Sequence, residues 1–490
     1  MSGPKKPRKC WECRGRRLVC DLSTPACEKS HQPAVSSRSR DITDGRAERG
    51  QWCTGTEMVP RSAKFDHPIR TALEAVQYFN AYLCPELLAT GDGGSRSPYH
   101  IPLAWVRYVP ESVIQTITCA SLGHRIIQLE GAPLEDQTTL VNRLRSHRGA
   151  ALRSIADHFG NPGQRTGDLT LLAIILLLMV ELQNSPSPEG WRRHCDAAFT
   201  IIDLRGGMLS VLRSRPASQP PLPYLFLIDV VGSTTAPGVE RTRALGQLDM
   251  LPLLHRLYGN GLATAFACPP DLLADIVRIN VLRSDKSLEG VERLRTATAI
   301  LQHILAFSPE GWAIGIISAR HAHENHPKLM GGGNVSPDRE VATCVRGTLA
   351  DWTPVARIYQ AAVAIYCIES SESSAGSYGA GDIIAGSDGL RKHVADELLR
   401  GLKAVAAGST SLGSHLRKVV IWPLVVAGIE VAADDCASRR FIIQELKWIG
   451  VAAGTNAPVR GVRFLEGLWA RKTPRGRWDD LFNEPYVFAV

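Results

Sequence analysis

Leu-Leu-Ala-Ile-Ile-Leu-Leu-Leu-Met-Val, at residues 171–180, is the longest strongly apolar run in the chain, and Glu181 ends it. A helix that crosses a membrane needs about 20 consecutive apolar residues, so this run is well short of a span. A helix buried in the core of a large domain explains the run better. We therefore expect a core helix at this place, and no membrane partner for the chain.

The segments on both sides of this run have the period of amphipathic helices. Ile69, Leu73, Val76 and Leu83 recur at steps of three, four and seven residues, so their side chains share one helix face. Period and length also favour helix over strand in the segments Leu140–Phe159, Trp191–Leu204, Leu272–Leu282, Val291–Phe307, Val341–Ile368, Leu390–Ala406, Leu416–Ala433 and Arg439–Val451. The sequence therefore predicts a mainly α fold.

Glycine and proline mark the breaks between these helices. Arg205-Gly206-Gly207 and the proline run at 220–223 are expected to separate helices, since glycine closes a helix and proline prevents its continuation. Residues 370–389 are rich in Ser and Gly, which predicts a surface loop or a disordered insertion.

The charge of the chain is concentrated at its N-terminus. Of the net charge of +8 over 490 residues, most arises in residues 1–62, which hold 13 Lys and Arg against 7 Asp and Glu. A basic tail on a nearly neutral body is typical of a polyanion-binding end, because Lys and Arg displace counterions from phosphate. A solvated terminus without structure is the alternative. Residues 28–63 lack periodic apolar positions, so we expect a disordered linker there and a helical domain over 64–490.

The cysteines fall into two groups. Eight of the 12 are scattered singly, mostly within apolar helical patterns, where a free Cys behaves as a small hydrophobic residue. The N-terminus has no apolar segment of the kind that secretory signals carry, so we expect the chain to stay in a reducing compartment.

The other four cysteines, Cys10, Cys13, Cys20 and Cys27, have the spacing C-x2-C-x6-C-x6-C. A C-x2-C pair lets two thiolates reach one ion from a tight turn, and two more complete the tetrahedron that Zn²⁺ prefers. Four unrelated free cysteines are the alternative, but a hydrophilic basic stretch offers them no core to fill. The spacing therefore predicts a zinc site in residues 1–27.

Basic residues lie between and before these cysteines. A short helix that starts near Cys13 would project Arg14, Arg16 and Arg17 away from the metal, toward phosphate or the edges of guanine bases. Lys9 and the basic residues before it are expected to add phosphate contacts, to act as a nuclear-import signal, or to be solvated. This segment therefore predicts double-stranded DNA as a partner.

Residues 10–27 resemble the fungal binuclear zinc cluster regulators, whose motif is C-x2-C-x6-C-x5-12-C-x2-C-x6-8-C. The resemblance implies that Cys10 and Cys27 bridge two zinc ions and that Cys13 and Cys20 complete the shell of the first ion. It also implies that Arg16 and Arg17, supported by Arg14, contact a C/G-rich triplet.

This sequence departs from the family pattern after its fourth cysteine. Ser30 stands where the fifth cysteine belongs, and no cysteine lies near position 37. His31 and Cys53 are poor replacements, because Cys53 would need a long loop to close. One zinc ion is therefore the expected content. A shifted reading frame or a misjoined exon over residues 28–62 is one hypothesis for the abrupt end of the pattern.

The rest of the chain resembles the helical fungal-specific transcription factor domain that follows such clusters, on passages such as Trp191–Gly207, Val419–Leu424 and Trp478–Phe482. The resemblance implies a nuclear regulator of RNA polymerase II transcription, with a regulatory, non-catalytic body that senses a small molecule or binds partners. A homodimer and transcription co-regulators are the implied protein partners.

Two other classes of protein are alternatives to this interpretation. An enzyme has its best candidate site at His321, His323 and His326, but neighbouring Pro327 and Gly331–Gly333 favour a solvated loop. No H-E-x-x-H, G-x-S-x-G or phosphate-binding loop is present, so we expect no catalysis. The second alternative is a helical regulator that does not bind DNA, in which the zinc cluster is inert.

Overall fold

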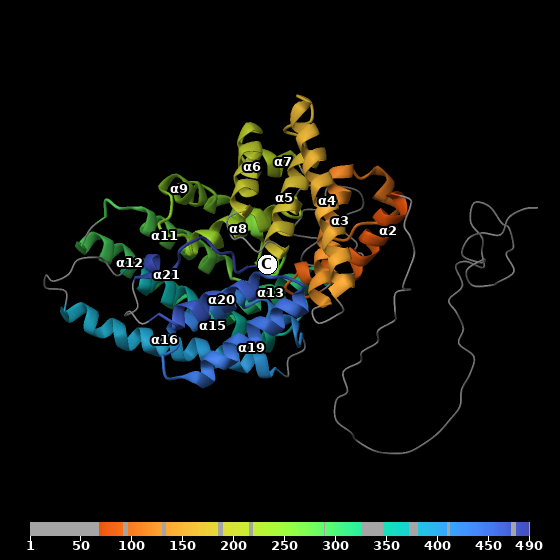
Figure 1. Cartoon of the computed structure of the whole chain (residues 1–490). Coiled ribbons are helices and arrows are strands. Elements are labelled where there is room, and N and C mark those ends of the chain that lie inside the picture. The colour runs from red at the N-terminus through yellow and green to blue at the C-terminus, as the bar shows by residue number, and fades with distance from the viewer. Residues whose placement is uncertain are drawn as a thin grey trace, which may run out of the picture. The chain divides into compact units, whose positions relative to one another are not determined.

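The computed structural model describes residues 68–91, 97–129, 134–184, 190–214, 219–288, 290–325, 346–371, 381–408, 412–471 and 477–489. All secondary structure in these ranges is helical, which confirms the predicted mainly α fold for the body (Figure 1). In chain order the elements are α2 (Pro68–Tyr78), η2 (Phe79–Leu83), η3 (Cys84–Leu87), η4 (Leu103–Tyr108), α3 (Glu111–Gln128), α4 (Leu134–Gly160), α5 (Asp168–Asn184), α6 (Gly190–Leu204), α7 (Met208–Ser214), α8 (Leu222–Thr234), α9 (Arg241–Asp249), η5 (Leu251–Leu253), α10 (Leu254–Tyr258), α11 (Pro270–Ser284), α12 (Gly290–Ala306), α13 (Pro309–Asn325), α15 (Leu349–Ser371), α16 (Gly381–Ala407), α17 (His415–Lys418), α18 (Ile421–Glu430), α19 (Cys436–Ala453), α20 (Ala457–Trp469) and α21 (Trp478–Leu481).

Helix α5 contains the apolar run 171–180 and is buried, as predicted. It packs against α3 and α6, and α3 in turn packs against α2 and α4. In Figure 1 these helices gather on one side of the body. An apolar run without amphipathic alternation can be satisfied only where neighbours cover a helix on most sides, and α5 has such neighbours.

Two further helices make the centre of the remaining core. Every residue of α8, Leu222–Thr234, is buried. Helix α15 packs against α11, α12, α13, α16 and α18, so segments far apart in the sequence meet around it. The long helices α15 and α16, together with α19 and α20, gather at the lower side of Figure 1.

A buried arginine holds the C-terminal segment onto this core. The Arg283 guanidinium, on α11, donates hydrogen bonds to the backbone carbonyls of Ser233, Thr234 and Ala236 at 2.8–3.0 Å. It also donates from Nε to Asp479 Oδ1 at 3.0 Å, on α21. Because a buried charge is costly unless it is fully hydrogen-bonded, this arrangement fixes α21 against the end of α8.

The breaks at glycine and proline are confirmed where they were predicted. Gly206 and Gly207 follow α6 with φ of +88° and +86°. Helix α8 begins at Leu222, within the proline run, with a proline in its first turn, where the missing N–H costs nothing.

Several predicted boundaries are wrong, because local pattern does not encode tertiary contacts. The predicted loop 370–389 contains the end of α15 and, from Gly381, the start of α16, whose later turns pack on α15 and support its propagation. Helix α15 begins only at Leu349, since Gly347 has φ of +106° and Asp351 Oδ2 accepts hydrogen bonds from Thr348. Leu416–Ala433 is broken between α17 and α18.

Of the scattered cysteines that the structure describes, Cys84, Cys119, Cys195, Cys268 and Cys367 are buried, as predicted for small hydrophobic residues. Cys436 is exposed at the start of α19, which corrects that prediction at one position. Within the described ranges no single helix is long and apolar enough to span a membrane. Length and composition alone would allow only a pair, Gly290–Ala306 with Pro309–Ala319, which is bent by 55°.

Candidate functional site

The predicted zinc and DNA-binding residues lie outside the described residues, which begin at Pro68. They are Lys9, Cys10, Cys13, Arg14, Arg16, Arg17, Cys20 and Cys27, together with the alternative ligands His31 and Cys53. Their roles therefore stay predictions, as do the domain boundaries at 27 and 63.

The histidine stretch, the best candidate for an enzyme site in the sequence, lies differently from the prediction. Helix α13 continues through Asn325, so His321 and His323 belong to its last turns and not to a loop. His326 lies outside the described residues. Among the residues that the structure describes, no group of three or more His, Cys, Asp or Glu side chains is placed to hold a metal ion.

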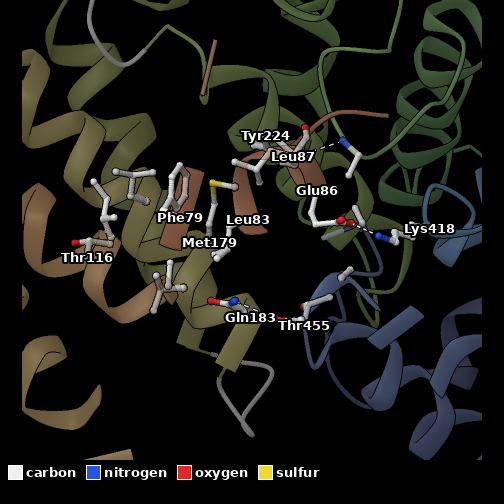
Figure 2. Close-up of a pocket in the computed structure, with 18 of the residues that line it drawn as sticks. Phe79, Leu83, Glu86, Leu87, Thr116, Met179, Gln183, Tyr224, Lys418 and Thr455 are labelled. Atoms are coloured by element: carbon white, nitrogen blue, oxygen red, sulfur yellow. Dashed lines mark hydrogen bonds and ion pairs between the residues drawn. The ribbon is translucent and has the colours of Figure 1, made fainter. Parts of the chain in front are cut away.

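The body has a pocket whose empty space, counted together with the open solvent at its mouth, is about 840 Å³ (Figure 2). Its walls come from η2, η3, α3, α5, α8, α17, α18 and the turn that follows α19, with Ala265 and Ala489 from outside the helices. Apolar side chains make most of the surface. They include Phe79, Leu83, Leu87, Ile117, Ala120, Leu176, Met179, Val180 and Ile421.

The wall that carries Phe79 and Leu83 is a single π-helical turn. Here α2, predicted to run as one helix to Leu83, widens at Phe79, and the Cys84 N–H bonds to the Phe79 carbonyl, five residues back. The wider turn changes the direction in which Leu83 leaves the helix relative to the regular 3.6-residue period. Phe79 and Leu83 both face the pocket, and π-helical turns of this kind are frequent at functional sites.

One end of the pocket carries an ion pair. The Lys418 ammonium, on α17, lies 2.6 Å from Glu86 Oε2, on η3. The two side chains are 12% and 16% exposed, so the pair is mostly withdrawn from water and weakly screened. Figure 2 shows this pair at one end of the pocket, and Thr116 and Phe79 at the other.

Tyr224 closes the pocket beside this ion pair. Its hydroxyl donates to the Leu87 carbonyl at 2.7 Å and accepts from the Ala265 N–H at 2.8 Å. Complete burial raises the pKa of the phenol well above its ordinary value. Because both hydrogen bonds go to backbone groups, Tyr224 fixes η3 against the chain near Ala265 and is not poised for proton transfer.

The turn after α19 forms the boundary of the pocket on the side opposite Tyr224 (Figure 2). Gln183 Nε2 donates to the Gly454 carbonyl at 3.0 Å, and the Asn456 N–H donates to the Gln183 carbonyl at 3.0 Å. Gly454 has φ of +63°, and an added Cβ would lie 2.0 Å from the His124 ring. The turn is therefore locked to α3 and α5 by a contact that only glycine allows.

His124 is held from its other side by Tyr78. The Tyr78 hydroxyl lies 3.0 Å from His124 Nδ1. Burial, and then the positive charge of Lys418, lower the pKa of His124 to about 4. Burial raises the pKa of Tyr78 to about 12. At neutral pH both groups are therefore uncharged, and they support the pocket boundary without adding charge to it.

These features favour binding over chemistry. The polar groups at the wall are occupied in holding backbone segments or each other, and the remaining surface is apolar. No motif or spacing in the sequence marks this site. Each apolar lining residue, taken alone, has the pattern of a core residue, and the lining residues are spread between positions 79 and 489.

Comparison with known proteins identifies the family of this chain. A model of the fungal specific transcription factor domain matches residues 74–488. A relative from Leptosphaeria maculans, named as a phomenoic acid biosynthesis cluster-specific transcriptional regulator, is 25% identical over 518 aligned positions, covering 100% of this chain and 91% of its own length.

An uncharacterized protein of Emericella nidulans is 30% identical over 109 residues, 22% of this chain and 23% of its own. No solved structure matches.

These names point to a transcription regulator and not to an enzyme, as predicted from the sequence. The family match covers most of the chain and includes every wall of the pocket except Ala489. The chain therefore belongs to the family of fungal-specific transcription factor domain proteins, and it is a fungal transcriptional regulator.

Proposed function

We propose that this regulator acts in the nucleus on RNA polymerase II transcription and binds DNA through a zinc module in residues 1–27. In this module Cys10, Cys13, Cys20 and Cys27 hold one Zn²⁺ ion as a tetrahedral set of thiolates. Residues 64–490 form the regulatory domain, and residues 28–63 link the two.

The observation that supports this proposal best is the extent of the relative's alignment. A protein named as a transcriptional regulator aligns along the whole of this chain, including the segment that carries the four-cysteine spacing. The relative's name also motivates the target class, since we propose that this chain controls genes of a fungal biosynthetic cluster.

Arg14, Arg16 and Arg17, supported by Lys9, are the proposed DNA contacts. Arginine can donate two hydrogen bonds to a guanine in the major groove, and the other basic groups neutralise phosphates. A C/G-rich triplet is the proposed site, and a homodimer or co-regulators bound to the helical domain are the proposed protein partners.

Zinc content and DNA binding test this proposal directly. Full-length protein should contain about one zinc per chain by elemental analysis, and the Cys10→Ser/Cys13→Ser variant should contain none. A matched Cys195→Ser variant, changed at a buried cysteine of α6, should keep its zinc. Binding to a duplex with a C/G-rich triplet should exceed binding to a scrambled duplex at the same salt, and that difference should vanish in the double variant.

Ser30 favours a second candidate function, a helical regulator that acts only through protein partners. Ser30 occupies the position of the fifth cysteine, so the support of a second zinc ion is missing. Zinc-free protein whose DNA binding is no stronger than its net charge provides would establish this second function and exclude the first.

A further inference from the structure

The pocket is an opening beside a core that contains large, fully buried side chains. Large side chains such as Trp352, Trp422 and Tyr359 are fully buried, and protein interiors normally leave few voids larger than a water molecule. An apolar opening loses the packing contacts that its lining would otherwise make, so an occupant that restores them is favoured.

The apolar wall is built to stay open. Phe79 and Leu83 reach it from the π-helical turn η2, while Met179 and Leu176 reach it from α5. Both elements are held through α3, whose Ser121 hydroxyl donates to the Ala75 carbonyl of α2 at 3.0 Å and which packs on α5. Collapse of the wall would require these helices to move together, so the wall fits a hydrocarbon group.

The ion pair indicates which polar group the occupant carries. The Lys418 ammonium has three N–H donors, and in the described residues Glu86 is the acceptor that it meets. A second carboxylate beside Lys418 therefore gains a charge-assisted hydrogen bond. An ammonium group on the occupant would instead compete with Lys418 for Glu86.

The surrounding electrostatics favour an anion over a cation at this end. The pKa values of His124 and His415 are both lowered, first by burial and then by the positive charge of Lys418. Glu86 opposes this effect at His415. Lys418 therefore acts on both imidazoles while Glu86 offsets it at His415, so an anionic group is better placed on the His124 side of the ion pair.

We propose that this pocket binds an apolar small molecule with one carboxylic acid group, whose carboxylate lies beside Lys418 and whose hydrocarbon part packs on Phe79, Leu83 and Met179. Binding requires no change in covalent structure and no metal. It is independent of the zinc module, because all residues that carry it lie in the helical domain.

Isothermal titration calorimetry on the full-length protein tests the proposal with three probes built on a ten-carbon chain: decanoic acid, methyl decanoate and decylamine. Each probe is used below its critical micelle concentration or, for the ester, below its solubility limit. Decanoic acid should bind about tenfold more tightly than the other two, because it alone adds a charge-assisted hydrogen bond to Lys418.

Two variants and one control separate the parts of the proposal. Glu86→Gln/Lys418→Gln keeps a hydrogen-bonding pair but removes both charges, so the acid should lose its preference while the ester binds as before. Ala120→Phe should weaken all three probes by filling the pocket, and Ala120→Leu does so with less strain. Lys403→Gln, on α16 away from the pocket, should bind all three as the wild type does.

Each of the following results would overturn one part of the ligand proposal. No binding of any probe by folded wild-type protein would refute the pocket as a ligand site. Binding of decylamine or the ester that equals or exceeds that of decanoic acid would refute the proposed carboxylic acid group of the ligand. An acid preference that persists in Glu86→Gln/Lys418→Gln would refute the role of Lys418. Since none of these measurements involves DNA or zinc, a failure here leaves the proposed DNA-binding function untouched.

Discussion

Replacing Gly454 with alanine should destabilise the helical domain far more than the same change at a matched glycine. Gly454 ends α19, and the next N–H, of Thr455, returns to the Gly450 carbonyl at 3.0 Å. Gly206 ends α6 in the same way, since the Gly207 N–H returns to the Ile202 carbonyl at 2.9 Å. Both glycines have positive φ, +63° and +88°.

The two sites differ in what a methyl group would meet. At Gly206 the nearest atom, Ser210 Cβ, lies at 3.5 Å, an ordinary contact. At Gly454 the nearest is His124 Cδ2, at 2.0 Å. Alanine in the left-handed region costs about 1 kcal/mol at either site. At Gly454 the displaced imidazole adds about 1–3 kcal/mol of overpacking, and the lost bond to Tyr78 adds about 1 kcal/mol. The totals are about 1 kcal/mol for Gly206→Ala and about 3–5 kcal/mol for Gly454→Ala.

Urea denaturation followed by far-ultraviolet circular dichroism measures both costs, provided that the dependence on urea has the same slope in all variants. The double variant Gly454→Ala/His124→Ala should be more stable than the sum of its single changes predicts, because removal of the imidazole removes the clash. Equal losses for Gly454→Ala and Gly206→Ala, or additive effects in the double variant, would refute the close approach of the turn to His124.

Three further predictions concern the supports of the helical domain. Arg283→Met should lower the free energy of unfolding by about 3–5 kcal/mol in urea denaturation, because three carbonyls at the end of α8 lose a buried donor. Asp479→Asn, at a side chain that is 39% exposed, should lower it by about 1 kcal/mol or less. Similar losses in the two variants would contradict the central role of the arginine. Burial and then Lys418 lower the pKa of His124 from 6.5 to about 4, so between these pH values the unfolded chain binds a proton that the folded chain does not. The free energy of unfolding should therefore fall by up to about 3 kcal/mol as the pH is lowered from 7 to 4, and the His124→Gln variant should lack that part of the fall; an unchanged pH slope in the variant would exclude His124 as its source. Asp435→Ala should cost about 1 kcal/mol, because the Asp435 carboxylate accepts the Ser438 N–H at the start of α19, and the neighbouring Asp434→Ala serves as the control that should cost little.

Helices whose burial follows from the local pattern of apolar residues were predictable. The run 171–180 became α5, and the predicted Trp191–Leu204 differs from α6 by one residue. In both cases the apolar positions alone determine which side is covered, and a Gly-Gly turn ends α6 through its backbone conformation. Composition and period contain this information because it depends on residues a few positions apart.

Interruptions inside helical patterns were not predictable, because they depend on contacts between distant residues. Nothing in the period of Ile69–Leu83 distinguishes an α-helix from one that widens into a π-helical turn at Phe79. Likewise the apolar segment at 416–433 continues across Val419 and Val420, where α17 and α18 separate. The Tyr359 hydroxyl accounts for part of this break, since it donates a hydrogen bond to the Val419 carbonyl.

The pocket illustrates the stronger limit, because a cavity is defined by what side chains fail to touch. Phe79 and Met179 have the same apolar pattern as neighbours that are fully packed, and only the folded arrangement shows that they face an opening. The cysteine motif is the reverse case, since its spacing implies chemistry without any fold. The two sites therefore rest on unrelated kinds of information. If zinc is absent but decanoic acid binds, the chain is a ligand-binding regulator that reaches DNA only through partners. If zinc is present and no probe binds, the regulatory signal must enter through a protein surface instead.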